Sequence, residues 1–316
     1  MKRTLLSIII PLYNKEKYIS ECLESIVNCK YDVEIIVIDD GSTDNSANIV
    51  EDFIRKYYMK NIKLLKQKNK GPSSARNEGI RFSNSEYTLF LDADDYFNSK
   101  SLDYLIDLAK KYNADLIEFD FCNSKIDICQ PKIVYKYNSR IKLLKQLLNK
   151  KKIKSVVWGT LFKTEICKEI AFLENMKWGE DSCYKLDYIL NCNSGIYVQA
   201  PYYVNRILFD NTLSRQKISH EMIKSVISYI DYYEYKLKGI KDINRDLNNR
   251  LFKTCVSYIR LCKKIDKNEY TKEILLLKSK CKNYIKKIKM DSYKYLIFYM
   301  FLILFDKNRS NDTLEL

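Results

Sequence analysis

The sequence predicts an α/β protein in which a doubly wound, mostly parallel sheet is followed by a helical C-terminal region. Residues 1–120 alternate short apolar runs with amphipathic stretches, which is typical of strand–helix–strand units with right-handed crossovers. The apolar runs are rich in β-branched residues and end in turn residues, as buried parallel strands do. From residue 219 onward the chain has no proline and is rich in Ile, Leu, Tyr and Lys, which favours helices.

Each expected element follows from its own pattern of apolar residues. Leu5–Ile10 and Val33–Ile38 are predicted strands, and Glu16–Cys29 between them carries apolar residues at helical spacing. The further elements expected, in chain order, are a helix at Ala47–Tyr58, a strand at Ile62–Leu65, a helix at Ser73–Phe82, a strand at Tyr87–Leu91, a helix at Ser101–Lys111, a strand at Asp115–Phe121, a helix at Tyr137–Lys154 and one or two short strands at Gly195–Val204. Ligands of open α/β sheets bind beyond the carboxyl ends of the strands, so the turns after the strands are expected to share one edge.

The composition limits the class of protein and its partners. With 46% hydrophobic and 13% aromatic residues, the chain is too apolar for a largely disordered protein and can bury a sizeable core. The formal net charge of +15 favours a polyanionic partner, which could be a nucleic acid, an anionic membrane or a phosphorylated substrate. Ten cysteines are scattered without a CxxC, and the single histidine, His220, stands apart from them, which argues against a zinc site. The N-terminal apolar run is too short for a secretory signal, so we expect reduced thiols and a cytosolic setting.

Three carboxylates follow the apolar strand that ends at Leu91. Asp92, Asp94 and Asp95 lie within four residues, and such crowding is repulsive unless a cation is near. Mg²⁺ and Mn²⁺ prefer oxygen ligands and can be shared between carboxylates and phosphates. Taken alone, the cluster is interpreted equally well as a metal site or as an acidic turn that caps the next helix.

Three further turns carry residues suited to binding a nucleotide. After the first strand, Pro11 fixes a turn and Tyr13 offers a flat face for a base. After the second strand, a carboxylate of the Asp39-Asp40 pair could accept the hydrogen bond of a nucleobase ring N–H. The start of the Ser73–Phe82 helix, together with Arg76, could meet phosphate oxygens. Each motif alone is also compatible with an ordinary joint between a strand and a helix, but their order on successive strand ends favours a nucleotide site.

Together these motifs resemble those of family 2 glycosyltransferases of the GT-A fold, bacterial enzymes that build capsules, lipopolysaccharide and cell-wall glycopolymers. The strongest resemblance covers residues 5–110, through the segments SIIIPLYNKEKYISECLESI, EIIVIDDGSTDNS, NKGPSSARNEGI and YTLFLDADD. A weaker one continues to about residue 215, through VWGTLFKTEI, WGEDSCY and YYVNRILFDNTLSR. The resemblance implies a GT-A, Rossmann-like catalytic domain over residues 1–217, with a nucleotide-sugar half at about 1–120, an acceptor half at about 121–217, and a helical region over residues 218–316.

The resemblance also implies roles for single residues. Glu180 and Asp181 match an acceptor-side acidic pair, in which Asp181 is the general base and Glu180 orients donor or acceptor. An inverting transfer needs a carboxylate to deprotonate the acceptor hydroxyl as it attacks the anomeric carbon, while a metal ion and nearby cations stabilise the departing nucleoside diphosphate. On the donor side, the implied roles are base and ribose binding by Pro11, Tyr13 and Asp40, a place in the nucleotide pocket for Arg76, contact with the ribose or donor sugar by Asp92, diphosphate binding by the Asp92-Ala93-Asp94 motif, and a Mn²⁺ or Mg²⁺ ion on Asp94.

The implied function is transfer of a hexosyl or N-acetylhexosaminyl group from a UDP-sugar to a hydroxyl of a glycan acceptor, which could be linked to a lipid carrier. Many relatives carry a histidine shortly after the YYxxR stretch, where it can complete the coordination of the metal, but residues 206–210 here read RILFD. Either Asp210 or water substitutes for this histidine, or metal binding is weaker; Arg206 and Arg215 could help to neutralise the diphosphate. The alternative function is a catalytically silent scaffold that binds a nucleotide-sugar or a membrane.

The end of the chain suggests a second contact surface. A lysine-rich stretch precedes the apolar run Tyr295–Phe305, whose eleven residues would make about 16 Å of helix, too short to cross a hydrocarbon core of about 30 Å. Beside lysines, such a helix could lie in the headgroup region of an anionic membrane. Packing on the catalytic domain or on a sister subunit of a homo-oligomer is nearly as well supported. We expect a cytoplasmic protein at the inner face of the cell membrane, and no nucleic-acid partner because no base-reading module is present.

Overall fold

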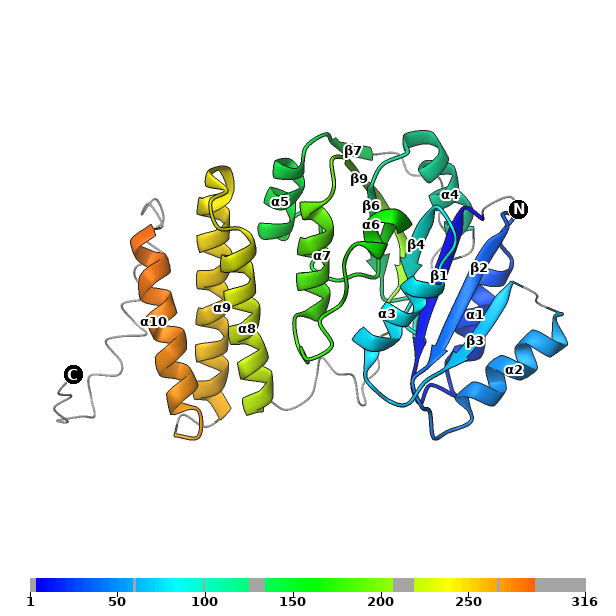
Figure 1. Ribbon diagram of the computed structural model, residues 1–316, viewed down its shortest axis with the longest axis horizontal. Coiled ribbons are helices and arrows are strands. Elements are labelled where there is room, and N and C mark those ends of the chain that lie inside the picture. Colours follow the sequence, from blue (N-terminus) through cyan, green and yellow to red (C-terminus); the bar gives the residue numbers. More distant parts are fainter. Residues whose placement is uncertain are drawn as a thin grey trace. The chain divides into compact units, whose positions relative to one another are not determined.

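The computed structural model describes residues 4–58, 61–98, 100–124, 134–206, 219–265 and 268–287 (Figure 1). The chain forms two compact units, Met1–Ile243 and Asn244–Leu316. The first unit contains the sheet. In the second unit, the described residues form two helices that pack against each other, α9 (Asn244–Ile265) and α10 (Thr271–Lys287).

The strands of the described residues form one sheet in the order β3-β2-β1-β4-β8-β6-β9-β5, with β7 also paired to β9. Strands β3, β2, β1 and β4 run parallel, and so do β6 and β9, whereas β8, β5 and β7 pair antiparallel with their neighbours. The predicted fold class is confirmed, and the parallel half lies where the repeated strand–helix pattern predicted it. The bounds of the strands are β1 Leu6–Leu12, β2 Val33–Asp39, β3 Ile62–Lys66, β4 Tyr87–Phe90, β5 Tyr96–Phe97, β6 Leu116–Cys122, β7 Val134–Tyr137, β8 Thr160–Lys163 and β9 Gly195–Val204.

Both faces of β2 are covered, which explains why its sequence is a continuous apolar run. Ile35 and Val37 belong to the main core, which also contains buried residues of α1, whereas Ile36 and Ile38 pack with Ala75 of α3 on the other face. Figure 1 shows α3 on the near side of the sheet beside β1, and α1 behind β2 and β3. The helices of the first unit are α1 Ile19–Val27, α2 Ser46–Lys56, α3 Pro72–Phe82, α4 Ser101–Tyr112, α5 Arg140–Leu148, α6 Thr164–Lys168, α7 Glu180–Leu190, α8 His220–Lys236 and the short 3₁₀ helix η2 Lys241–Ile243.

One helix starts later and ends earlier than its sequence pattern predicts. A helix was expected over Tyr137–Lys154, but strand β7 runs to the first of these residues and α5 begins only at Arg140. Ser139 sets the start, because its hydroxyl accepts a hydrogen bond from the Lys142 amide at 3.3 Å and caps the first turn. Just beyond the end of α5, Lys150 takes a left-handed conformation with φ 49°, which does not continue a helix.

The C-terminal part of the first unit bears on the domain limits. We expected a boundary after residue 217, but residues 207–218 lie outside the described part, so this boundary stays a prediction. Beyond that gap, α8 packs on α7 within the first unit, where the hydroxyls of Tyr233 and Ser182 lie 2.7 Å apart. His220 is the exposed first residue of α8. The apolar run Tyr295–Phe305 lies outside the described residues, and none of the described helices is long and apolar enough to cross a membrane.

The contact between α3 and β1 gives a prediction about stability. A Cβ atom at Gly79 would lie 2.3 Å from Cγ2 of Ile9, so Gly79→Ala must displace α3 from the sheet. Overpacking a core costs about 1–3 kcal/mol, which outweighs the roughly 1 kcal/mol by which Ala exceeds Gly in helix propensity. We expect Gly79→Ala to lower the free energy of unfolding by up to about 2 kcal/mol in urea denaturation. In Ile9→Ala/Gly79→Ala the loss should be smaller than the sum of the single losses, because the smaller side chain makes room; additive losses would contradict the steric explanation.

Candidate active site

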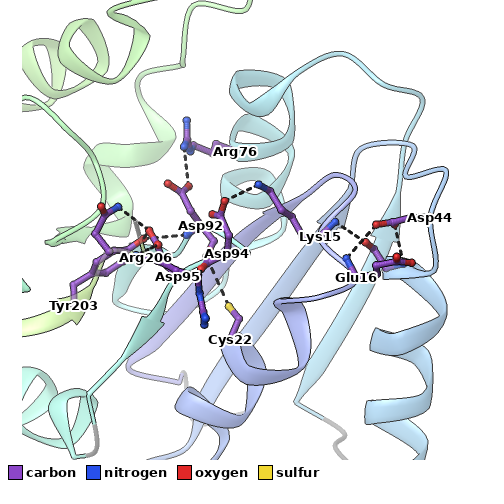
Figure 2. A network of polar contacts seen from close by, with 12 residues as sticks. Lys15, Glu16, Cys22, Asp44, Arg76, Asp92, Asp94, Asp95, Tyr203 and Arg206 are labelled. Carbon is purple, nitrogen blue, oxygen red and sulfur yellow. Dashed lines mark hydrogen bonds and ion pairs between the residues drawn. The ribbon is translucent and has the colours of Figure 1, made fainter. Parts of the chain in front are cut away.

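The acidic loop between β4 and β5, residues 91–95, lies beside the loop that follows β1 (Figure 2). Asp94 forms an ion pair with Lys15, with Nζ 2.6 Å from Oδ2. The backbone amide of Lys15 in turn donates to Ser46 Oγ at 2.7 Å, at the start of α2. Ala93, which lies between Asp92 and Asp94 in the chain, is buried in the main core and anchors the loop. The turns after β1, β2 and β4 therefore meet at one edge of the sheet, as the parallel topology predicted.

Pro11 and Tyr13 lie at the end of β1, at the same edge. Pro11 is half-buried in the strand, whereas Tyr13 is 44% exposed and its ring is accessible to a ligand. The next residue, Asn14, is in a left-handed conformation with φ 50°, and its Oδ1 accepts a hydrogen bond from the Thr43 amide at 2.8 Å. This bond holds the turn that carries Tyr13 against the loop after β2.

Asp40 is nearly fully buried, and its carboxylate organises the loop that leads into α3. Its Oδ1 accepts hydrogen bonds from Gln67 Nε2 at 2.7 Å and from the Lys70 amide at 2.8 Å, and its Oδ2 accepts one from the Gly71 amide at 2.8 Å. An ionised carboxylate has about four acceptor positions, which leaves one for a nucleobase N–H. The same bonds bring the start of α3, and with it Arg76, to the edge of the sheet.

Arg76 joins the two carboxylates for which the resemblance implied roles on opposite substrates. Its Nη2 lies 3.0 Å from Asp92 Oδ1, and its Nη1 lies 3.1 Å from Asp181 Oδ1. The side chain is 7% exposed, and its Nε has no hydrogen-bond partner among the described residues. Burial alone would lower the pKa of Arg76, but the charges of Asp181 and Asp92 outweigh burial and raise it. Arg76 is therefore a permanent buried cation between the two carboxylates.

Glu180 and Asp181 form the first turn of α7, directly after Gly179, whose φ of 86° favours glycine. Burial raises the pKa of Glu180 to about 7, and the charge of Asp181 adds to this rise. Asp181 Oδ1 faces Arg76, and Oδ2 faces the backbone N–H of Val157 at 3.5 Å. The Asp181 side chain is 18% exposed. Its carboxylate is thus oriented from two sides and still accessible.

Asp95, the third carboxylate of the acidic loop, faces the interior. It accepts hydrogen bonds from the Tyr203 hydroxyl at 2.6 Å, the Arg206 amide at 2.7 Å and Asn205 Nδ2 at 3.2 Å. Burial, followed by the charge of Asp92, raises the pKa of Asp95 to about 7. Asp95 therefore fastens the end of β9 to the acidic loop. Sequence reasoning did not find this partnership, although the YYVNR segment was part of the weaker resemblance.

Arg206 is a second cation under the acidic loop. Its Nε donates to the carbonyl oxygen of Asp94 at 3.0 Å, and its guanidinium pairs with Glu21. The same guanidinium lies 5.1 Å from the ring centres of both Tyr18 and Tyr96. It was expected to help neutralise a diphosphate, and in the structure it supports the loop that carries Asp94. The other groups expected there, Asp210 and Arg215, lie outside the described residues.

The acidic loop offers part of a metal site. In the described part of the chain, no three His, Cys, Asp or Glu side chains gather as a metal centre. The Asp94 carboxylate is 19% exposed and already faces a cation, so it provides the kind of oxygen that Mg²⁺ and Mn²⁺ prefer. Such ions are commonly held by one or two carboxylates together with substrate phosphates and water. The residues present therefore fit a divalent ion that is bound together with a diphosphate.

Comparisons with known proteins identify a family that matches this chain. A family model described as glycosyl transferase family 2 matches residues 7–170. The chain is 32% identical over 219 residues to a poly(ribitol-phosphate) beta-glucosyltransferase of Bacillus spizizenii, covering 62% of this chain and 31% of the relative. It is 29% identical over 251 residues to the poly(ribitol-phosphate) beta-N-acetylglucosaminyltransferase TarS of Staphylococcus aureus, covering 76% of this chain and 41% of the relative. The chain therefore spans less than half the length of either relative.

Solved structures share the fold. TarS residues 1–349 in complex with UDP-GlcNAc superpose with a TM-score of 0.60 at 19% identity, covering 90% of this chain and 93% of that one. A mannosyltransferase from Pyrobaculum calidifontis in complex with GDP-Man and Mn²⁺ gives a TM-score of 0.54 at 16% identity, covering 98% and 89%. At these identities the likeness shows the fold alone, and it agrees with the sheet described above.

The raised pKa of Glu180 gives a pH-dependent prediction. A carboxyl group with a pKa of about 7 in the native protein binds its proton more tightly there than in the unfolded chain, where the value is about 4.3. Its contribution to stability is present below about pH 4 and is lost as the pH rises through 7. Glu180→Gln should therefore raise the free energy of unfolding by on the order of 1–3 kcal/mol at pH 8 and change it less at pH 5. Urea denaturation at both pH values measures this.

The control for this prediction is Glu169→Gln, at an exposed carboxylate just after α6. Its effect should be the same at pH 5 and pH 8. A gain from Glu180→Gln that does not grow with pH would show that burial does not penalise the ionised form of Glu180.

Proposed function

The chain belongs to glycosyl transferase family 2, and from this membership we propose that it transfers a sugar from a UDP-sugar to a hydroxyl of a glycan acceptor, with inversion at the anomeric carbon. The observation that carries the proposal is the contact of Arg76 with both Asp92 and Asp181. It joins the loop suited to a nucleotide-sugar to a carboxylate suited to act as a base. A binding scaffold would not need a cation that links the nucleotide-sugar loop to Asp181.

The donor is a UDP-sugar held at the edge of β1 and β2. The exposed ring of Tyr13 stacks on the base, next to Pro11, and the open acceptor position of Asp40 receives the base N–H. Solved structures of TarS contain UDP and UDP-GlcNAc, and these support UDP as the nucleotide here. The sugar itself is a hexosyl or N-acetylhexosaminyl group, in keeping with the names of the relatives.

Asp181 is the general base. As the acceptor hydroxyl attacks the anomeric carbon, its proton moves to Asp181, and the bond from that carbon to the UDP oxygen breaks. Arg76 and the Val157 amide orient the carboxylate from two sides, so that its exposed part can meet the hydroxyl. Glu180, with its pKa near 7, hydrogen-bonds donor or acceptor beside the base.

The leaving UDP needs positive charge, which this chain provides close to the acidic loop. Asp92 and Ala93 lie against the donor diphosphate, and Asp94 would hold a Mn²⁺ or Mg²⁺ ion there in exchange for Lys15. Such an ion, when bound, neutralises charge on the diphosphate oxygens. A mannosyltransferase of similar fold has been solved with GDP-Man and Mn²⁺, which supports a divalent ion as the cofactor.

The acceptor is a glycan of a capsule, a lipopolysaccharide or a cell-wall polymer, and it could be carried on a lipid. Two relatives act on poly(ribitol-phosphate) according to their names, and the net charge of +15 suits a polyanionic chain or an anionic membrane surface. The enzyme then works in the cytoplasm, at the inner face of the membrane. The catalytically silent scaffold remains the alternative outcome of the test below.

Replacing the proposed base should abolish transfer and leave the fold intact. Asp181→Asn keeps the shape of the side chain and removes the base, so UDP release should fall on the order of 10²- to 10⁴-fold. The assay screens purified protein against a panel of UDP-sugars with and without Mn²⁺ and reads free UDP; thermal unfolding checks the fold. Glu165→Gln, an exposed carboxylate of α6, should keep full turnover. Turnover of Asp181→Asn near the wild-type rate would refute the base assignment, and no UDP from wild type with any donor or acceptor would favour the scaffold.

Replacing Asp94 should weaken the binding of the metal ion. Asp94→Asn keeps one oxygen and loses the negative charge, so the Mn²⁺ concentration for half-maximal UDP release should rise and the maximal rate should fall by about 100-fold. A Mn²⁺ titration of both proteins measures this. Asp52→Asn, an exposed carboxylate of α2, serves as the control. An unchanged Mn²⁺ titration for Asp94→Asn would place the ion elsewhere.

A further inference from the structure

Beneath the proposed base lies a fully buried ion pair that the mechanism above does not use. Lys185 on α7 and Glu118 on β6 are both 0% exposed, and their Nζ and Oε2 lie 2.6 Å apart. Lys185 Nζ also donates to Thr160 Oγ1 at 2.6 Å and to the Val156 carbonyl at 2.9 Å. All three hydrogens of the ammonium group therefore have partners.

Glu118 uses both of its oxygens on the same stretch of chain. Oε1 accepts a hydrogen bond from the Lys154 amide at 2.8 Å, and Oε2 accepts one from the Thr160 hydroxyl at 2.7 Å. The ion pair thus holds residues 154–160 at three points, namely Lys154, Val156 and Thr160. We call residues 154–160 the base-facing segment, because the amide of Val157 within it faces Asp181 Oδ2.

The same ion pair also fixes the helix that carries the base. Lys185 comes four residues after Asp181 on α7, so the two side chains leave the helix on one face. One network therefore fixes both the helix of Asp181 and the backbone amide that its carboxylate meets.

Stability alone does not explain why such a pair is kept. Removing two charges from water costs so much that apolar residues of similar volume are often equally good or better for stability. A buried pair that is satisfied at every hydrogen bond instead defines one arrangement of the chain around it. The arrangement that this pair defines includes α7 and the Val157 amide, which both position Asp181. A role in orienting the base therefore explains why the ion pair lies here.

We infer that Lys185, acting through Glu118, is a positioning residue for Asp181. It contacts neither donor nor acceptor. Its ammonium group ties α7 to the base-facing segment and so keeps the Asp181 carboxylate at the angle from which it takes the acceptor proton. The inference rests on the proposed function, in which Asp181 is the base.

The test replaces the pair rather than one partner, since a single change would leave an unpaired charge in the interior and could prevent folding. Glu118→Gln/Lys185→Met keeps an oxygen acceptor for the Lys154 amide, offers Thr160 Oγ1 an amide donor in place of Lys185, and removes both charges. The matched control is Glu86→Gln/Lys163→Met, which removes another ion pair of the first unit, between β8 and the residue before β4, at 2.6 Å. Thermal unfolding confirms that both variants are folded.

The kinetic measurement is UDP release from UDP-GlcNAc, or from the UDP-sugar most active with wild type. For Glu118→Gln/Lys185→Met we expect kcat to fall at least about tenfold and KM for the donor to stay within about twofold, because a misplaced base slows the chemical step without weakening donor binding. The control pair should leave both constants unchanged. A folded variant with wild-type kcat, or one that loses kcat and donor affinity together, would overturn the inference.

Hydrogen exchange supplies a readout that does not depend on activity. Amides of residues 154–160 should exchange faster in Glu118→Gln/Lys185→Met than in wild type, and at the wild-type rate in the control pair. Unchanged exchange in this segment would refute the anchoring even if kcat fell. If wild type released no UDP from any donor, the proposed function would fail in its own assay, while exchange would still report whether the ion pair holds the segment.

Discussion

The arrangement of the site depends on one buried cation, the guanidinium of Arg76. It brings Asp92, from the loop after β4, and Asp181, from the start of α7, to within 3.1 Å of its nitrogens although 89 residues separate the two carboxylates in the chain. Without a cation between them, these largely buried carboxylates would repel each other, and burial already raises the pKa of Asp92. The guanidinium suits this task because it stays charged when buried and offers separate donors to two partners.

Arg76 reaches this place because α3 packs directly on β1. Gly79, one turn further along α3, has no side chain where it meets Ile9, and a larger residue would hold the helix further out. The neighbouring Asn77 exchanges two hydrogen bonds with the backbone of Phe172, at 2.8 and 3.0 Å. The Phe172 ring in turn stacks on Tyr184 of α7 with its centre 3.8 Å away. The segment around Arg76 therefore sets the position of α7, and with it that of the proposed base.

How far the sequence predicts this arrangement differs between the two halves of the sheet. In the parallel half, apolar runs and helical spacing indicate each element, and parallel strands end at one edge of the sheet. The sequence therefore predicts that Tyr13, Asp40 and Asp92 lie close together. Beyond β4 the pairing is largely antiparallel and spans long separations, and the fully buried strand β8 has too short a pattern to be recognised. Contacts such as Arg76 with Asp181 and Lys185 with Glu118 depend on that packing. A charged residue inside a strand, such as Glu118, is ordinarily expected to face water. That Glu118 is buried instead becomes clear only from the structure, in which it pairs with the buried Lys185.

The cations around the acidic loop differ in how easily a ligand can replace them. Arg76 is buried between two carboxylates, so displacing it would leave charged groups without a partner, whereas Arg206 is held at once by Glu21, a backbone carbonyl and two aromatic rings. Lys15 is 27% exposed on a loop and pairs with Asp94, whose side chain is 19% exposed. Its long side chain can move into water at little cost, since ammonium groups are strongly hydrated. Of these three cations, Lys15 is therefore the one that the proposed divalent ion would replace at Asp94 when it binds with the diphosphate. Arg76 and Arg206 would hold the acidic loop in place during this exchange.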